Sequence, residues 1–270
     1  MLCGEMFVQP AGSGLPEIVL VHGFACDHTD WAAQLAELGR AHAVLACDLR
    51  GHGKTPGELA DASIERLGAD VARLLAQREL EEAILVGHSM GTRVVLEAYR
   101  SAPERVAGLV LVDGSQLGSG DPVQVEAATR ATIDAAGFPA FVEAVFKQMF
   151  LGPSDDATRI IARAKRLPAA FGTALFARML RWDAASLEAA LDAVRVPLMI
   201  IQSTTMSPEH KRVPIAAGQT TPWLDLVRRH VPSARIETIT GVGHFSQIEA
   251  PGRLSGLLMD FADSLSESRP

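Results

Sequence analysis

A Gly-His-Ser-Met-Gly pentapeptide at positions 87–91 is the segment of this sequence best suited to covalent chemistry. It follows the apolar run Ala83 to Val86 and precedes a helical pattern from Thr92 to Arg100. A Gly-x-Ser-x-Gly pattern between a strand and a helix is typical of a nucleophile elbow, a strained turn in which only glycines fit the close approaches beside the serine. The pattern predicts that the hydroxyl of Ser89 projects above a sheet, where it can attack a carbonyl carbon.

A serine hydroxyl is a weak nucleophile at neutral pH, so this hypothesis requires a neighbouring base. His244 is the best candidate, because it follows a predicted strand in the segment Gly-Val-Gly-His-Phe at 241–245. It also lies C-terminal to Ser89, as the chain order Ser, then acid, then His requires. Among the other histidines, His28 is a candidate only for the rim of a substrate pocket.

Acyl transfer also needs N–H donors that stabilise the oxyanion of the transition state. The backbone amide of Met90, directly after the serine, is expected to be one donor. The second is expected from the amide of Phe24, in a His-Gly-Phe segment that follows another predicted strand. Gly23 allows this loop to approach closely, and His22 is expected to hold the loop by hydrogen bonding.

Short apolar runs that alternate with amphipathic helical patterns must position these groups. Continuously apolar strands separated by helices predict a parallel sheet covered on both faces. Right-handed crossovers place the C-terminal ends of such strands at one edge, where ligands bind in open α/β sheets. The predicted strands are Ile18–Val21, Ala43–Cys47, Ala83–Val86, Leu109–Val112, Leu198–Ile201 and Arg235–Ile239. The predicted helices between them are Trp31–Leu38, Ile64–Arg78, Thr92–Arg100, Trp223–His230 and Arg253–Leu265.

One stretch, from Leu117 to Val194, has helical patterns but no convincing strand. We interpret it as a helical cap, residues 117–194, inserted into an α/β core of residues 1–116 and 195–270. Packing between helices accounts for most of its apolar side chains, and an apolar substrate pocket under the cap is the functional interpretation. The pocket candidates, besides His28, are Phe146, Met149, Phe150, Trp182 and Phe245.

Composition narrows the classes of partner. The chain has 270 residues, is 48% hydrophobic and carries a formal net charge of −7, with basic residues scattered along it. This pattern argues against nucleic acid and anionic membranes as partners, and no apolar run approaches the ~20 residues of a membrane span. Three cysteines lack metal-site spacing, so no metal or other cofactor is predicted. With no signal-peptide pattern, the chain is expected in the cytoplasm, acting on a small molecule.

Four motifs together resemble the α/β-hydrolase superfamily, over a stretch from Ile18 to Ala262. The resemblance is closest to cofactor-free esterases, lactonases and carbon–carbon hydrolases that have a helical cap. It implies an α/β-hydrolase fold, with a mostly parallel central sheet flanked by helices and the cap inserted after the strand that ends at Asp113. The motifs are His-Gly-Phe at 22–24, Asp-Leu-Arg-Gly-His-Gly at 48–53, Gly-His-Ser-Met-Gly at 87–91 and Gly-Val-Gly-His-Phe at 241–245.

Two further expectations come from this resemblance. Epoxide hydrolases and haloalkane dehalogenases have an aspartate where this chain has Ser89, so those branches are excluded. The Asp-x-x-Gly-x-Gly segment is structural in the resembled family, so Asp48 and Arg50 are expected to brace the loops beneath the site.

The carboxylate that should orient His244 departs from the family pattern. Most relatives carry it in a Gly-x-x-Asp loop after the strand that corresponds to Leu198–Ile201. Here that loop reads Gln-Ser-Thr-Thr-Met-Ser at 202–207 and contains no acid. The remaining candidates are Asp113 at the end of the preceding strand, Asp225 within a predicted helix, and Glu209 in a loop. We favour Asp113, although an aspartate at a strand end also serves as a turn residue.

The sequence therefore predicts a serine hydrolase that cleaves a small to medium carboxylic ester or lactone with an apolar acyl part, through an acyl-enzyme on Ser89. Two alternatives remain open. The same three residues could catalyse carbon–carbon bond hydrolysis or a lyase reaction. The fold could also serve a binding or receptor protein with slow turnover, which the missing acid loop would explain. The sequence predicts neither the physiological substrate nor the oligomeric state.

Overall fold

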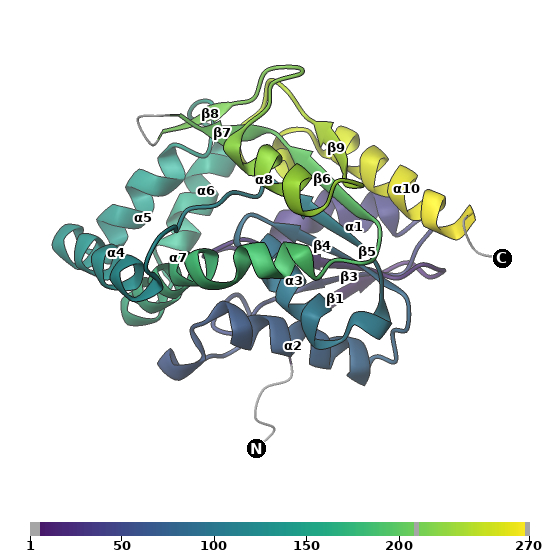
Figure 1. Cartoon of the computed structure of the whole chain (residues 1–270), viewed down its shortest axis with the longest axis horizontal. Helices are drawn as coiled ribbons and strands as arrows, with labels where there is room; N and C mark the ends of the chain where they lie inside the picture. The colour runs from purple at the N-terminus through teal and green to yellow at the C-terminus, as the bar shows by residue number, and fades with distance from the viewer. Residues whose placement is uncertain (1–5, 208–210, 268–270) are drawn as a thin grey trace.

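The computed structural model describes residues 6–207 and 211–267, and within them seven strands form one central sheet (Figure 1). The strand order is β1-β3-β2-β4-β5-β6-β9. β1 runs antiparallel to β3, and the other neighbouring pairs of this sheet are parallel. The strands are β1 Val8–Ala11, β2 Ile18–Val21, β3 Val44–Cys47, β4 Ala83–His88, β5 Val106–Val112, β6 Leu198–Gln202 and β9 Arg235–Thr238.

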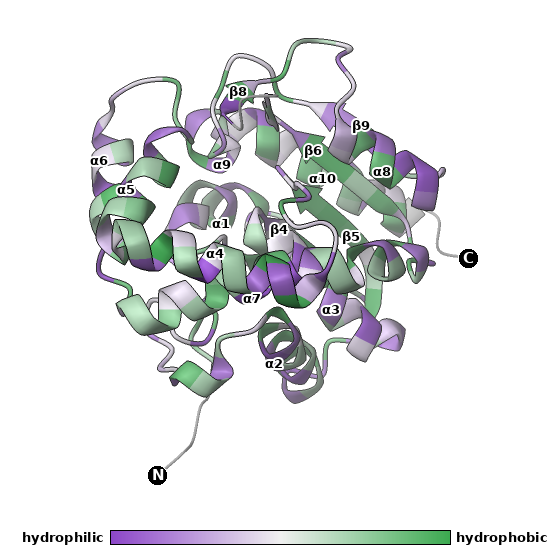
Figure 2. Ribbon diagram, turned by 60° about the vertical axis from the view of Figure 1, so that its left-hand side comes forward, coloured by the Kyte–Doolittle hydropathy of each residue, from purple (hydrophilic) through white to green (hydrophobic). Residues whose placement is uncertain are grey.

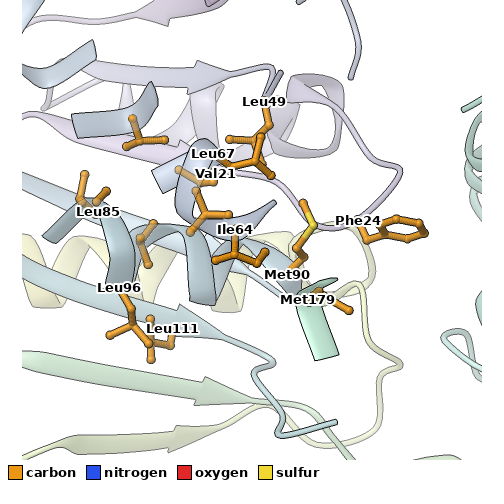
Figure 3. Packing of buried hydrophobic residues seen from close by; sticks show 14 of the residues in the cluster. Val21, Phe24, Leu49, Ile64, Leu67, Leu85, Met90, Leu96, Leu111 and Met179 are labelled. Carbon is orange, nitrogen blue, oxygen red and sulfur yellow. The ribbon is translucent and has the colours of Figure 1, made fainter. Parts of the chain in front are cut away.

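Helices cover both faces of this sheet. One face packs against α1 (Ala32–Leu38) and α10 (Pro251–Glu267), and the other against α2 (Ile64–Gln77) and α3 (Met90–Ser101). Alternate strand residues therefore enter two separate hydrophobic clusters. On the α2 and α3 side, Val21, Leu85 and Leu111 meet apolar side chains such as Ile64, Leu67 and Leu96 (Figure 3). On the α1 and α10 side, Leu20, Val86 and Val112 meet Trp31, Leu38 and Leu258.

The mostly parallel sheet flanked by helices confirms the predicted fold class. Both faces of the central strands are buried, which is why those strands are continuously apolar instead of alternating (Figure 2). The six predicted strands and five predicted helices are all present, with ends that differ from the prediction by at most three residues. The predicted helix Trp223–His230 is α8 (Pro222–His230). The described chain also has α9 (Ser246–Glu249) and the 3₁₀ helices η1 His28–Trp31, η2 Leu59–Asp61 and η3 Pro103–Arg105.

Two features of the strands were not predicted from the sequence. The first is β1, which contains Pro10. Proline argues against a strand, but β1 is an edge strand and leaves one side of its backbone unpaired. The other is a two-stranded hairpin of β7 (Thr204–Met206) and β8 (Arg212–Pro214), which follows β6 closely. Its three-residue strands are too short for periodicity to reveal.

Four helices, joined by loops, occupy the interval between β5 and β6, and the described residues 113–197 contain no strand. They gather at one end of the sheet, away from α1 and α10 (Figure 1). None of the described helices is apolar over a length that could cross a bilayer. The four are α4 Pro122–Ala136, α5 Phe138–Lys147, α6 Asp155–Ala164 and α7 Ala169–Asp192.

Candidate active site

Ser89 occupies a strained turn between β4 and α3. Its φ of 55° and ψ of −113° lie where L-residues are rarely found, which is typical of a nucleophile elbow. A Cβ at Gly87 would lie 2.2 Å from the carbonyl oxygen of Gly91, and a Cβ at Gly91 would lie 2.5 Å from that of Val21. Positions 87 and 91 must therefore both be glycine for the chain to turn this sharply from β4 into α3.

Asp113 follows β5 on the strand adjacent to the elbow. The backbone N–H of Ser89 donates to the carbonyl of Val112 at 2.9 Å, so the serine and the aspartate leave neighbouring strands side by side. Asp113 is fully buried and has a φ of 52°. Its Oδ2 lies 3.3 Å from Nδ1 of His244. The structure thus brings together the acid and the histidine that the sequence analysis favoured.

The segment after β6, which lacks the expected acid, instead surrounds the carboxylate of Asp113. The backbone N–H groups of Ser203 and Thr204 donate to Asp113 Oδ1 at 3.2 and 3.0 Å. The hydroxyl of Thr204 donates to the same oxygen at 3.1 Å, and the hydroxyl of Ser203 contacts Oδ2. This loop therefore supplies hydrogen-bond donors to an acid that stands one strand away.

These donors and the neighbouring cation Arg212 favour the ionised form of Asp113. Burial alone raises the pKa of this carboxyl, but hydrogen bonding to His244, the charge that His244 carries when it is protonated, and the charge of Arg212 oppose that effect. The net result is a pKa of Asp113 below its ordinary value. An ionised carboxylate can orient an imidazole and stabilise an imidazolium.

The structure does not support Asp225 as the partner of His244. Asp225 is in the first turn of α8, its side chain is 53% exposed, and it bonds Thr220 and Arg228 on the surface. A carboxylate in the first turn of a helix interacts favourably with the helix dipole, which is a structural role. Glu209, the third candidate, lies outside the described residues.

His244 is buried and neutral at ordinary pH. Burial and then the positive charge of Arg212 lower its pKa from 6.5 to about 4, against the raising effect of Asp113. With Nδ1 directed at the carboxylate, the proton belongs on Nδ1, which leaves the Nε2 lone pair unprotonated. Nε2 has no hydrogen-bond partner among the described residues, so it is available to accept a proton.

The loop that carries His244 is fixed from two sides. Its backbone N–H donates to the carbonyl of Met149, after α5, at 2.6 Å. Its own carbonyl lies 2.8 Å from Nε2 of His88, the elbow residue that precedes Ser89. Burial and then the charge of His244 lower the pKa of His88 to about 3, so this ring is neutral and donates from Nε2.

The loop after β2 lies against the elbow. A Cβ at Gly23 would lie 3.2 Å from the Cβ of Ser89, so the loop approaches the serine closely. His22 donates from Nδ1 to the carbonyl of Gly23 at 2.7 Å and accepts at Nε2 from the N–H of Leu49 at 3.0 Å. The predicted role of His22 in holding this loop is confirmed. Phe24 follows Gly23 and Met90 follows Ser89, the two residues that are in close contact here. The role of the Phe24 and Met90 amides as oxyanion donors stays a prediction.

Asp48 and Arg50 brace neighbouring loops, as the family resemblance implied. Asp48 accepts the backbone N–H groups of His28 and Lys54, both at 2.8 Å. Arg50 forms a bidentate pair with Asp70 on α2, with N–O distances of 2.6 and 2.9 Å. The confirmed role of both residues is therefore structural.

A cavity of about 160 Å³ opens beside Ser89, between the sheet edge and helices α5 and α7. Its wall is mainly apolar, but it also holds two arginines, Arg93 and Arg212. Met149 lines it, as predicted. The other lining residues are Phe24, Ser115, Leu117, Val145, Gln148, Phe176, Met179 and Met206.

Three of the aromatic residues predicted to line the pocket, Phe146, Phe150 and Phe245, pack against one another. Phe150 stacks on Phe245 with ring centroids 4.9 Å apart and an interplanar angle of 8°. Phe146 is also packed against Phe245, at 6.2 Å between centroids. None of the three lines the cavity at Ser89. They are buried in a cluster that holds the His244 loop against α5, so their assignment to the substrate pocket is wrong.

The remaining two pocket candidates, Trp182 and His28, do not line the cavity at Ser89. Trp182 is buried, and its indole N–H donates to Glu97 on α3 at 2.6 Å. The Nδ1 of His28 bonds Asp48 at 2.8 Å, and the His28 ring packs against Phe7. Both side chains serve packing, and their prediction as pocket residues is corrected.

Arg93 was not singled out from the sequence, yet it joins the elbow to the helical insertion. Its guanidinium forms a buried bidentate pair with Asp183 on α7, with both N–O distances 2.7 Å. It also donates to the carbonyls of Ser89 and Ser115 at 3.2 and 2.6 Å. Asp183 in turn accepts the backbone N–H of Leu117 at 2.8 Å. A lone arginine in a helical pattern gives no sequence signal of such a role.

This pair leads to a stability prediction. Asp183→Ala leaves the guanidinium of Arg93 buried without its counter-charge, and we expect the free energy of unfolding to fall by about 3–5 kcal/mol. Urea unfolding followed by circular dichroism measures the change. The control is Asp225→Ala, which breaks an exposed pair with Arg228 and should cost less than about 1 kcal/mol. Equal losses in the two variants would contradict the prediction.

One group of acidic and histidine side chains has the composition of a metal site. Among the described residues, ligand atoms of Asp27, His28 and Asp48 lie within 4.8 Å of one another. His28 already donates to Asp48, and Asp27 is paired with Arg163 at 2.8 Å. With these atoms engaged in protein contacts, the group does not fit a metal ligand set.

The sequence and the fold of this chain are similar to those of known proteins. Residues 18–256 match the model of the alpha/beta hydrolase family. The chain therefore belongs to the alpha/beta hydrolase family, and its structural neighbours have the same fold. A thermophilic esterase from Thermogutta terrifontis superimposes with a TM-score of 0.76 at 23% identity, covering 97% of this chain and 94% of the other.

Two curated relatives give a coarser view of activity. A dihydrolipoyllysine-residue acetyltransferase component of the acetoin cleaving system from Cupriavidus necator is 29% identical over 92% of this chain. The chain spans 63% of that relative's length. A putative carbamate hydrolase, RutD, from Pseudomonas savastanoi pv. phaseolicola is 27% identical over 92% of this chain and 94% of its own. These names describe the relatives, and for this chain the family match itself shows membership of the alpha/beta hydrolase family.

Proposed function

We propose that this protein is a serine hydrolase that cleaves a small to medium carboxylic ester or lactone with an apolar acyl part. The observation that carries the proposal is the buried pair of Asp113 and His244 beside a strained Ser89 that opens into a mainly apolar cavity. The named activities of the two relatives, acetyl transfer and carbamate hydrolysis, both concern a carbonyl carbon and support the same class.

In the proposed mechanism, Oγ of Ser89 attacks the substrate carbonyl while Nε2 of His244 accepts the hydroxyl proton. The carboxylate of Asp113 stabilises the resulting imidazolium through Nδ1. The amides of Phe24 and Met90 donate to the oxyanion of the tetrahedral intermediate. Collapse expels the alcohol, which takes the proton from His244, and water then hydrolyses the acyl-enzyme by the same steps.

We further infer that residues 117–194 act as a cap on a core of residues 1–116 and 195–270. α5 contributes Val145 to the cavity opposite the elbow, the segment after α5 contributes Met149, and α7 contributes Phe176 and Met179. Apolar walls exclude water from the acyl part of a substrate, which strengthens the electrostatic interactions of the oxyanion. The free, buried thiols of Cys26 and Cys47 fit the expected cytoplasmic location.

Initial rates on a substrate panel test this function. The panel contains p-nitrophenyl acetate, butyrate and hexanoate, a six-membered lactone, and a diketone that a carbon–carbon hydrolase would cleave. We expect turnover of the esters or the lactone well above the uncatalysed rate, with no added cofactor. Cleavage of the diketone alone would favour the carbon–carbon hydrolase, and an absence of turnover on every substrate would favour a binding protein.

The low pKa of His244 predicts an unusual pH profile. Only unprotonated Nε2 can accept the serine proton, and a pKa of about 4 keeps it unprotonated through the weakly acidic range. We therefore expect kcat/KM to stay near its neutral-pH value down to about pH 5 and to fall through pH 4, whereas an unperturbed histidine would lose activity near pH 6.5. Brief pH-jump assays from a neutral stock separate this titration from acid unfolding. An acid limb at pH 6.5 would contradict the expected pKa.

A further inference from the structure

The β7–β8 hairpin places a cation in the wall of the cavity at Ser89. Met206 at the end of β7 pairs with Arg212 at the start of β8, and both side chains line the cavity. Ser203 and Thr204, just before and at the start of this hairpin, hold the carboxylate of Asp113. The hairpin is therefore anchored at the catalytic acid, and it brings Arg212 to the space that a substrate of Ser89 would fill.

The two arginines of the cavity differ in their partners. Arg93 is neutralised by both carboxylate oxygens of Asp183. The guanidinium of Arg212 donates to one neutral group, the hydroxyl of Thr204, at 2.9 Å. Among the described residues, Arg212 forms no ion pair with a carboxylate.

The charge of Asp113 influences Arg212, but the two residues do not form an ion pair. The oxygens of Asp113 accept hydrogen bonds from the backbone N–H groups of Ser203 and Thr204, and they face Nδ1 of His244. Burial lowers the pKa of Arg212 and the charge of Asp113 only partly opposes this effect. A guanidinium has five N–H donors and binds carboxylates in a bidentate fork, so most of its donors remain for another anion.

We propose that Arg212 binds a carboxylate of the substrate, so that the preferred ester or lactone is anionic. Apolar walls beside one cation suit a short hydrocarbon chain that bears a carboxylate at one end and the reactive carbonyl at the other. This inference rests on the proposed function, because it assigns the second recognition element of the same site. Arg212 is a specificity residue here, and its contact with substrate is separate from its electrostatic effect on His244.

Matched substrates separate those two effects. The anionic substrate is mono-p-nitrophenyl glutarate, and the neutral one is its methyl ester, in which the same chain carries a masked carboxylate. A second pair, the butyrate esters of 4-hydroxybenzoate and of methyl 4-hydroxybenzoate, places the carboxylate on the alcohol side. Rates are measured at pH 7, above the acid limb of His244, so that a changed histidine pKa does not enter the comparison.

The variants are Arg212→Gln, Arg212→Lys and the control Lys211→Gln, which removes the same charge from the exposed neighbouring residue. In Arg212→Gln we expect the ratio of kcat/KM for the anionic over the neutral ester to fall about 10- to 100-fold in at least one pair, the usual range for a charge-assisted hydrogen bond. Arg212→Lys should restore part of the ratio, and Lys211→Gln should leave it within about twofold.

An equal loss on the anionic and neutral esters in both pairs would overturn the proposal and make Arg212 a support for His244 alone. Arg212→Met, which keeps the apolar stem, replaces the glutamine variant if that one does not fold. Binding of glutarate and of its neutral monoamide, measured by calorimetry, gives a readout without hydrolysis. If no ester is turned over, the proposed function fails. If glutarate binding does not depend on Arg212, the carboxylate site fails by itself.

Discussion

Ser89→Ala is expected to lower kcat/KM for p-nitrophenyl butyrate by about 10⁴-fold or more, because it removes the atom that forms the acyl-enzyme. The remaining oxyanion donors and cavity would give only weak acceleration. Alanine has no larger side chain than serine and meets the same backbone strain at φ 55°, so the fold should persist. Stopped assays at high enzyme concentration measure the residual rate.

The matched control for Ser89→Ala is Ser101→Ala, at the other end of α3. Ser101 is exposed and donates only to the carbonyl of Glu97, so its removal should leave kcat/KM within about twofold. Both variants should retain the circular dichroism spectrum and the cooperative thermal transition of the parent. Turnover by Ser89→Ala within tenfold of the parent would reject Ser89 as the nucleophile.

Asp113→Asn is expected to lower kcat/KM by about 10³- to 10⁴-fold with little change in KM. An asparagine of the same shape can still accept from the N–H groups of Ser203 and Thr204, so the loop after β6 keeps its partner. An amide directed at Nδ1 of His244 can donate a hydrogen bond there, which favours the tautomer with a protonated Nε2. That tautomer cannot take the proton of Ser89.

Asp225→Asn is the matched control for Asp113→Asn. Its exposed carboxylate contacts Thr220 and Arg228, so we expect kcat/KM within about twofold of the parent. The double variant should match Asp113→Asn alone, because distant independent sites add. A large loss in Asp225→Asn together with near-normal Asp113→Asn would reverse the assignment.

The sequence predicted the sheet and the convergence of the three candidate catalytic groups because both depend on simple geometry. Parallel strands end at one edge, so Ser89 after β4, Asp113 after β5 and His244 after β9 had to approach one another. The choice of Asp113 over a residue in the usual loop depended on that loop having no acid. In the structure, Ser203 and Thr204 of this loop donate hydrogen bonds to Asp113. That contact depends on how β5 and β6 lie relative to each other, which the sequence of neither strand reveals.

The pocket was predicted less well, because helical periodicity marks an apolar face without showing what covers it. Met149 faces the cavity, whereas Phe146 and Phe150, on the same α5 segment and its loop, pack on Phe245. A difference of one to three positions along the chain decides whether a side chain faces the cavity or the core. Arg212 escaped prediction for a related reason, since it sits in a strand of only three residues that ends in Pro214.

The most direct test of the proposed catalytic centre is covalent labelling by a fluorophosphonate, followed by peptide mapping. Trypsin should release residues 79–93, in which Ser89 is the only serine. We expect stoichiometric phosphonylation of the parent at Ser89, labelling slowed at least about 100-fold in Asp113→Asn, and none of this peptide labelled in Ser89→Ala. An unlabelled 79–93 peptide in the active parent enzyme, or an adduct at another residue that blocks hydrolysis, would contradict the assignment of Ser89 as the nucleophile.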